Sequence, residues 1–236
     1  MNGDQKTLTT IAAFVLAVVL LFSTPTTVRA QVTNLNPGQS INLATVIGNN
    51  LTLQIGDKQF GNFYFSYSAS DMTVSNINVT ALSNLIGFGL QFQQPLSAIG
   101  AQNKILGIGY TATVTDPNNL ISDIHLSIVG SAGGAGTGTV NEAALIGGFN
   151  GTTVATTSAF VLANTNLLSN AANIVPPQPE LWINKIVNVS GSGGPSDFAT
   201  ITVIQQTFSQ IPEPSTAFLV GLGMLGVVAL KRTRKS

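Results

Sequence analysis

Residues 121–129 read Ile121-Ser122-Asp123-Ile124-His125-Leu126-Ser127-Ile128-Val129, and their pattern indicates the fold class. Isoleucine or leucine at positions 124, 126 and 128 alternates with His125 and Ser127, which is the period-two pattern of a strand that buries one face. Leu51-Thr52-Leu53-Gln54-Ile55 alternates in the same way. A helix would instead repeat its apolar positions at every third or fourth residue. The pattern therefore predicts β-structure.

Similar strand patterns recur along the chain, separated by Gly, Asn, Pro and Asp turns. About ten short strands with such turns predict an all-β fold, an antiparallel sandwich of jelly-roll type. A short helix is expected only at 164–173. The strands are predicted at 51–55, 60–67, 74–79, 87–93, 105–114, 121–129, 139–146, 153–162, 181–189 and 198–208.

Three glycine-containing segments predict turns or loops. Residues 130–136 and 191–196 predict flexible connections, and neither carries the Lys-Ser/Thr pair of a phosphate-binding loop. Gly56-Asp57-Lys58 predicts a turn in which Asp57 bonds the backbone and Lys58 lies in solvent.

The first 30 residues have the organisation of a secretory signal peptide. Lys6 precedes an apolar run at 8–22, Ser23-Thr24-Pro25 breaks that run, and small residues follow up to Ala30. We expect cleavage between Ala30 and Gln31. The alternative is an uncleaved membrane anchor, although a run of about 15 residues is shorter than the roughly 20 that a span needs.

The chain ends with a polar motif, a short apolar stretch and a basic cluster. The two prolines of Pro212-Glu213-Pro214-Ser215-Thr216 exclude a helix there and predict an extended segment. A helix over Ala217–Leu230 would be about 21 Å long, which falls short of a hydrocarbon core of about 30 Å. Basic residues are expected to stay on the cytoplasmic side. The cluster consists of Lys231, Arg232, Arg234 and Lys235.

Together these features resemble the PEP-CTERM sorting signal of exported bacterial proteins, over Ile211 to Ser236. The resemblance implies that exosortase, a membrane-embedded cysteine protease-transpeptidase, recognises Pro212, Glu213 and Pro214 and cuts near them. It also implies a link to exopolysaccharide, biofilm or extracellular matrix. The segment 55–63, Tyr110 and Glu142 resemble the β-rich bodies found ahead of such signals, which implies no activity. An ordinary tail anchor is the alternative.

These signals divide the chain into a signal peptide at 1–30, an extracellular β-sandwich at 31–210 and a sorting signal at 211–236. The precursor is expected to be anchored transiently in the inner membrane through 217–230. After processing, the body is expected at the cell surface or outside the cell.

The body between residues 31 and 211 carries few charges. It has seven acidic and three basic side chains, far below the usual quarter of residues. The lack of a basic patch argues against electrostatic binding of nucleic acid, and we expect no nucleic-acid partner. The chain has no cysteine, which removes disulfides, a cysteine nucleophile and zinc-thiolate sites.

Candidate catalytic groups are sparse. His125 is the only histidine, and a triad would need Asp123 or Asp116 with a serine, but no Gly-x-Ser-x-Gly elbow is present. Glu142 and Glu180 are the carboxylates from which a glycosidase pair would be drawn.

Two binding sites are also conceivable. Asp116 and Asp123 would be ligands of a calcium site, although the segment first predicts a turn. Trp182 would stack on a sugar if it were not a core or edge residue.

We assign no catalytic residue, metal ligand or cofactor. The leading hypothesis is a non-enzymatic exported surface or matrix protein that exosortase processes. The alternative is a secreted carbohydrate-binding module, and an exported hydrolase comes third.

Overall fold

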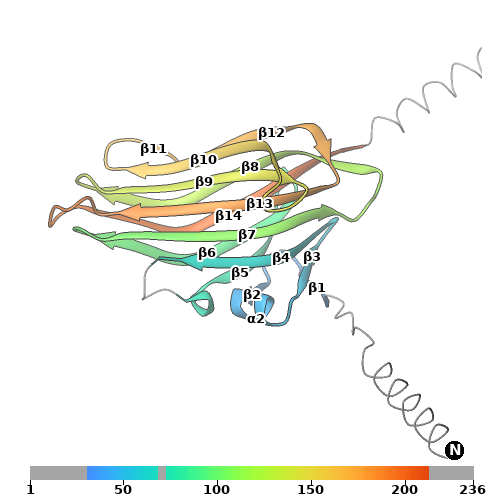
Figure 1. Cartoon of the computed structure of the whole chain (residues 1–236), viewed down its shortest axis with the longest axis horizontal. Helices are drawn as coiled ribbons and strands as arrows, with labels where there is room; N and C mark the ends of the chain where they lie inside the picture. Colours follow the sequence, from blue (N-terminus) through green and yellow to red (C-terminus); the bar gives the residue numbers. More distant parts are fainter. Residues whose placement is uncertain (1–30, 69–72, 213–236) are drawn as a thin grey trace, which may run out of the picture. The chain divides into compact units, whose positions relative to one another are not determined.

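The structure, a computed structural model, describes residues 31–68 and 73–212. In these residues the chain forms two β-sheets packed face to face, which confirms the predicted all-β sandwich (Figure 1). The signal peptide predicted at 1–30 and the helix predicted at 217–230 lie outside the described residues. Within the described ranges, no helix has the length and apolar character to cross a membrane.

The larger sheet contains eight strands in the described part of the chain. Its strands pair antiparallel except for β1 and β3, which are parallel. In spatial order the strands are β1 (Val32–Asn34), β3 (Thr52–Ile55), β4 (Lys58–Tyr67), β7 (Asn103–Val114), β13 (Glu180–Ser190), β9 (Thr137–Ile146), β10 (Thr152–Leu162) and β11 (Asn166–Leu167).

The smaller sheet has six described strands, all antiparallel, and β14 lies between β8 and β6. A short helix, α2 (Leu43–Gly48), follows β2, and the Asn42 side chain caps it by accepting from the Ala44 amide at 3.0 Å. The 3₁₀ turn η1 covers Val74–Asn76. In spatial order the strands are β12 (Ser169–Gln178), β8 (Asn119–Gly133), β14 (Phe198–Pro212), β6 (Phe88–Ile99), β5 (Asn78–Ser83) and β2 (Ser40–Asn42).

An aromatic cluster joins the two sheets in the core. Phe60 and Tyr110 of the larger sheet meet Phe92 and Phe208 of the smaller sheet, with ring centroids 5.7–6.1 Å apart. All four side chains are buried, and burial raises the pKa of the Tyr110 phenol well above its ordinary value. Tilted and edge contacts at these distances are favourable for aromatic rings. The cluster therefore sets the two sheets face to face.

Three expectations about secondary structure were wrong. The helix expected at 164–173 is instead β11 and the start of β12, because Ser169–Asn173 pairs with β8. Residues 74–76 form a 3₁₀ turn, so that strand begins only at Asn78. Gly130–Gly133 is not a flexible connection but the end of β8, paired with β14.

Alternation along β13 gives a matched pair of variants. Leu181 is fully buried and Ile186 is half exposed on the same strand. We expect Leu181→Ala to lower the free energy of unfolding by about 2–5 kcal/mol. Ile186→Ala should stay within roughly 0.5 kcal/mol of the wild type. Urea unfolding measures both, and equal losses for the two variants would contradict the assignment of faces.

Candidate functional site

The outer face of the larger sheet carries a polar groove of about 450 Å³. Asn184 of β13 lies opposite Ala143 of β9, and Ile186 lies opposite Asn141. Thr156 and Ser158 of β10 continue these two rows. At the sheet edge Asn170 of β12 closes the groove, where its side-chain amide donates to the Ser158 carbonyl at 3.1 Å. Amide and hydroxyl side chains thus dominate the groove.

An aromatic trio adjoins this groove. The Phe149 ring makes edge contacts with Tyr64 and Trp182, at centroid distances of 4.6 and 4.8 Å. Tyr64 lies over Gly109, where an added Cβ would collide with its ring. The Tyr64 hydroxyl donates to the Asn184 side-chain oxygen at 2.7 Å, and partial burial raises the pKa of Tyr64. The trio and the groove therefore share one hydrogen-bonded surface.

Trp182 has a fixed orientation on this surface. Its indole N–H donates to Glu180 at 3.0 Å, and the Thr113 hydroxyl donates to the same carboxylate at 3.1 Å. Trp182 is only partly buried. It is a residue of the outer sheet face rather than of the core, so part of its side chain is exposed to solvent.

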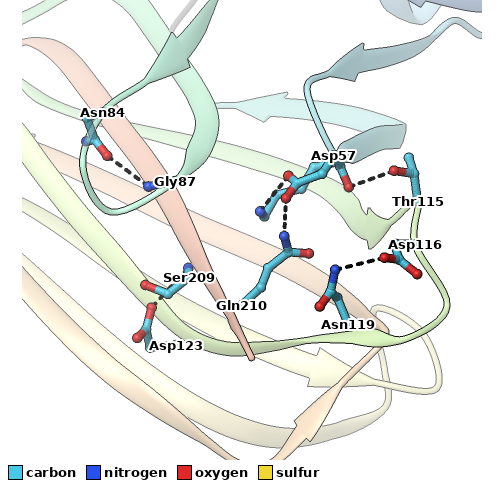
Figure 2. Close-up of polar contacts among 10 residues, drawn as sticks. Asp57, Asn84, Gly87, Thr115, Asp116, Asn119, Asp123, Ser209 and Gln210 are labelled. Carbon is cyan, nitrogen blue, oxygen red and sulfur yellow. Dashed lines mark hydrogen bonds and ion pairs between the residues drawn. The ribbon is translucent and has the colours of Figure 1, made fainter. Parts of the chain in front are cut away.

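A second polar cluster surrounds the end of β14, next to the sorting motif (Figure 2). The Gln210 side-chain amide donates to the Asp57 carboxylate, and the Ser209 amide donates to Asp123 at 3.1 Å. The Asp57 carbonyl accepts from both the amide and the hydroxyl of Thr115. Since β14 stays paired with β8 up to Pro212, this cluster fixes the strand where the motif begins.

The expectation that Lys58 lies in solvent was wrong. Its side chain is 1% exposed rather than solvated, and its ammonium group lies 3.0 Å from Asp57 and 5.9 Å from the Phe88 ring centre. Desolvation lowers the pKa of Lys58, while the hydrogen bond to Asp57 and the charges of Asp57 and Asp123 act in the opposite direction. Asp57 does take part in a backbone hydrogen bond, but with its carbonyl oxygen, which accepts from the Thr115 amide. The same oxygen also accepts from the Thr115 hydroxyl.

The candidate catalytic carboxylates are not brought together. Glu142 points into the core and is fully buried, whereas Glu180 lies exposed on the outer face. In the register of the sheet Glu142 faces Lys185, five residues along β13 from Glu180. That separation is about 17 Å at roughly 3.3 Å per residue. The two carboxylates therefore cannot flank one glycosidic bond.

The histidine lies on the outer face of the smaller sheet. His125 Nε2 lies 3.0 Å from Asp123. Among the described residues no serine or threonine hydroxyl is within hydrogen-bond distance of this imidazole, so a nucleophile is not in place. Asp116 bonds Asn118 and Asn119 in its own turn, at 2.9–3.2 Å. Within 31–68 and 73–212 no three acidic or histidine side chains converge as a metal site.

Sorting residues are described only in part. Pro212 is the last residue of β14, and Gln31 accepts a hydrogen bond from the Thr52 amide through its carbonyl. Other sorting and cleavage residues lie outside the described part of the chain: Ala30, Glu213, Pro214, Ser215, Thr216, Lys231, Arg232, Arg234 and Lys235.

The sequence of the C-terminus matches a known family. Residues 210–235 match the family described as the PEP-CTERM protein-sorting motif. The chain thus carries a sorting signal of the kind that exosortases process. No curated protein matches the sequence.

Solved structures with a similar fold include sugar-binding modules. One is TmCBM61, solved with beta-1,4-galactotriose (9% identity, TM-score 0.29, 63% of this chain and 89% of that chain). Another is CsCBM6-3 from Clostridium stercorarium, solved with cellobiose (11% identity, TM-score 0.26, 75% and 97%). A third is the enzymatically active domain of tailspike protein 4 from bacteriophage CBA120 (18% identity, TM-score 0.26, 62% and 19%). Similarity this low concerns the β architecture and gives no information on ligands.

Lys185 was missed from the sequence, where Glu142 was considered only as a glycosidase carboxylate. Lys185 lies in the buried register of 181–189, and Glu142 lies in the buried register of β9. Alternation alone would therefore have placed both side chains in the core. The contacts of Lys185 with Glu142 and Gln206 arise because segments distant in sequence become neighbours in the fold.

Buried Lys58 gives a pH prediction. Because its pKa is lowered in the folded state, the folded protein releases this proton at a pH where the unfolded chain still binds it. Between the lowered pKa and 10.5 the free energy of unfolding should therefore rise with pH. Urea unfolding from neutral to alkaline pH should show that Lys58→Met flattens this rise. Lys104→Met is the control and should keep it, and an unchanged slope in Lys58→Met would refute the assignment.

Proposed function

We propose that this chain is a non-enzymatic exported protein of the cell surface or extracellular matrix, processed by exosortase through Pro212-Glu213-Pro214. The observation that carries the proposal is the sorting motif matched at 210–235. The precursor would be held in the inner membrane by 217–230 until it is cut, and the body would then be released or transferred.

The end of β14 supports this order of events. The strand is hydrogen-bonded to β8 as far as the Pro212–Asn119 pair, and Gln210 is tied to Asp57 (Figure 2). The motif therefore starts where the sheet ends, without intervening linker. A cut beyond Pro212 would leave every described strand intact, so processing need not unfold the domain.

The non-enzymatic part of the proposal rests on where the candidate groups lie. Glu142 and Glu180 are on opposite faces of the larger sheet, and the His125–Asp123 pair has no hydroxyl beside it among the described residues. Neither set has the geometry of general acid–base or nucleophilic catalysis.

Replacing Pro212-Glu213-Pro214 by alanines should block processing. Alanines restore helical freedom and remove the charge of Glu213, so the extended recognition segment is lost. In a host with an exosortase, immunoblots of membrane and extracellular fractions should show the larger precursor retained in the membrane. Pro195→Ala, an exposed loop proline, is the matched control and should be processed normally. A triple variant with wild-type size and location would contradict the proposal.

The groove on the larger sheet favours a second candidate function, binding of a neutral polysaccharide. Its accessible rim presents amides and hydroxyls, which both donate and accept hydrogen bonds, as sugar hydroxyls do. Glu142 contributes to the lining, but its carboxylate is buried against Lys185. A neutral, hydroxyl-rich ligand suits this chemistry better than a charged one.

The aromatic trio supplies the apolar half of such a site. Trp182 precedes Asn184 by two residues on β13 and so lies about 7 Å away on the same face. A sugar ring stacked on Trp182 would place its hydroxyls near Asn184. Pockets that combine an aromatic wall with a few fixed polar groups are typical of small-ligand sites.

We expect Trp182→Ala and Asn184→Ala each to weaken retention on polysaccharide by about tenfold, which corresponds to roughly 1.4 kcal/mol of binding free energy. Affinity electrophoresis of the processed protein in gels containing host exopolysaccharide measures this. Val129→Ala, an exposed position on the other sheet, should bind like the wild type. If the wild type is not retained on any polysaccharide, the binding function is excluded, while the sorting proposal stands.

A further inference from the structure

Three polar side chains meet inside the otherwise apolar core. Lys185 comes from β13, Glu142 from the adjacent β9, and Gln206 from β14 in the other sheet. Each is at most 3% exposed as a whole residue. The Lys185 amine contacts the Glu142 carboxylate and lies 2.6 Å from the Gln206 side-chain oxygen. The amine therefore bridges the two sheets.

Buried apolar side chains flank this cluster. On β13 the flanking inward residues Ile183 and Val187 are fully buried. On β14, Ile204 and Phe208 are at most 5% exposed. An ion pair in such a site recovers little net stability, because removing both charges from water costs several kcal/mol per ion, on the order of what their attraction returns. Stability alone therefore gives a weak reason for this cluster.

The same surroundings favour covalent chemistry. Desolvation lowers the pKa of Lys185 well below its ordinary value, which favours the neutral amine, the nucleophilic form. One oxygen of Glu142 contacts the amine, and the other, Oε1, is buried without a partner among the described residues. A carboxyl group so placed can take a proton from the amine and pass it to a leaving group.

Gln206 presents the matching electrophile. Its carboxamide oxygen faces Lys185, while its amide nitrogen donates to the Thr207 carbonyl at 3.3 Å. The carboxamide is thus held in one orientation, with its carbonyl beside the amine. Fixed proximity of this kind replaces a bimolecular encounter, which is a large part of the barrier in solution.

We propose that Lys185 and Gln206 form an intramolecular isopeptide bond, with Glu142 as the proton carrier. The bond from Lys185 Nζ to Gln206 Cδ forms, the bond from Cδ to Nε2 breaks, and ammonia leaves. Glu142 accepts a proton from the attacking amine and returns it to the departing nitrogen. A primary amide becomes a secondary amide, so no oxidant, reductant or further reactant is needed.

The bond would join β13 of the larger sheet to β14 of the smaller sheet. It closes a loop between positions 21 apart in sequence. In a chain without cysteine it would do what a disulfide does in other exported domains, by restricting the unfolded chain. It also secures the strand that leads to the sorting motif. This inference does not depend on the proposed function.

Peptide mass spectrometry of the unprocessed precursor, purified from a host without exosortase, tests the bond. Lys185 is followed by Ile186, so trypsin should cut an unmodified chain there and release Ile105–Lys185 and Ile186–Lys231. The cross-linked lysine resists trypsin. We expect a single peptide spanning 105–231, lighter than its sequence mass by one ammonia, with fragments that join Lys185 to Gln206.

Two variants separate the chemistry from the contacts. Glu142→Gln keeps the shape of the side chain and leaves Lys185 and Gln206 in place, yet should restore cleavage after Lys185 and the full sequence mass. Lys185→Met removes this trypsin site, so its peptide should span 105–231 at the full mass of the variant sequence, and the variant should unfold at a lower temperature than the wild type. Circular dichroism checks that each variant is folded.

The peptide masses of the wild-type chain test the bond even if both variants misfold. Cleavage after Lys185 with unmodified peptide masses would overturn the proposal. A deficit of one water instead of ammonia would also overturn it, because it would place the bond between Lys185 and Glu142.

Discussion

The other parts of the fold depend on the hydrogen-bonded pairing of β14 with β8 and β6. β14 is an inner strand of the smaller sheet and also the last described strand before the sorting motif. It supplies Phe208 to the aromatic cluster, Gln206 to the buried polar cluster and Gln210 to the contact with Asp57. The smaller sheet therefore remains incomplete until the segment directly ahead of the motif has joined it. Pairings between such distant segments form slowly, since they close long loops.

The two-residue period of the strands separates two kinds of chemistry. On β13 the inward side chain of Lys185 is buried in the core, while Trp182 and Asn184 lie on the outer face, where Asn184 lines the groove. The proposed bond-forming residue and the proposed binding residues thus lie on opposite faces of one strand. The low number of charged residues is consistent with both, because neither the groove nor the core cluster relies on a charged surface.

The sequence predicted the fold class well because alternation is local. The period seen at 121–129 recurs in β7, β9, β13 and β14, and the β-sandwich follows from it. The segment 164–173 was assigned wrongly because its pairing with β8 outweighs its weak local preference. Lys58 was expected in solvent since a turn residue is usually exposed, but the packing of Phe88 beside the turn buries it. Which strands become neighbours, and so which polar groups meet in the core, depends on contacts that no single segment encodes.

Amide hydrogen exchange along β14 in the full-length chain tests the central role of this strand most directly. Exchange of an amide reports the free energy of the opening that exposes it. We expect the amides of β14 from Ile204 to Phe208 to be among the slowest to exchange, with protection persisting to Ile211. Exchange over 204–211 as fast as in the loop at 191–196 would contradict it.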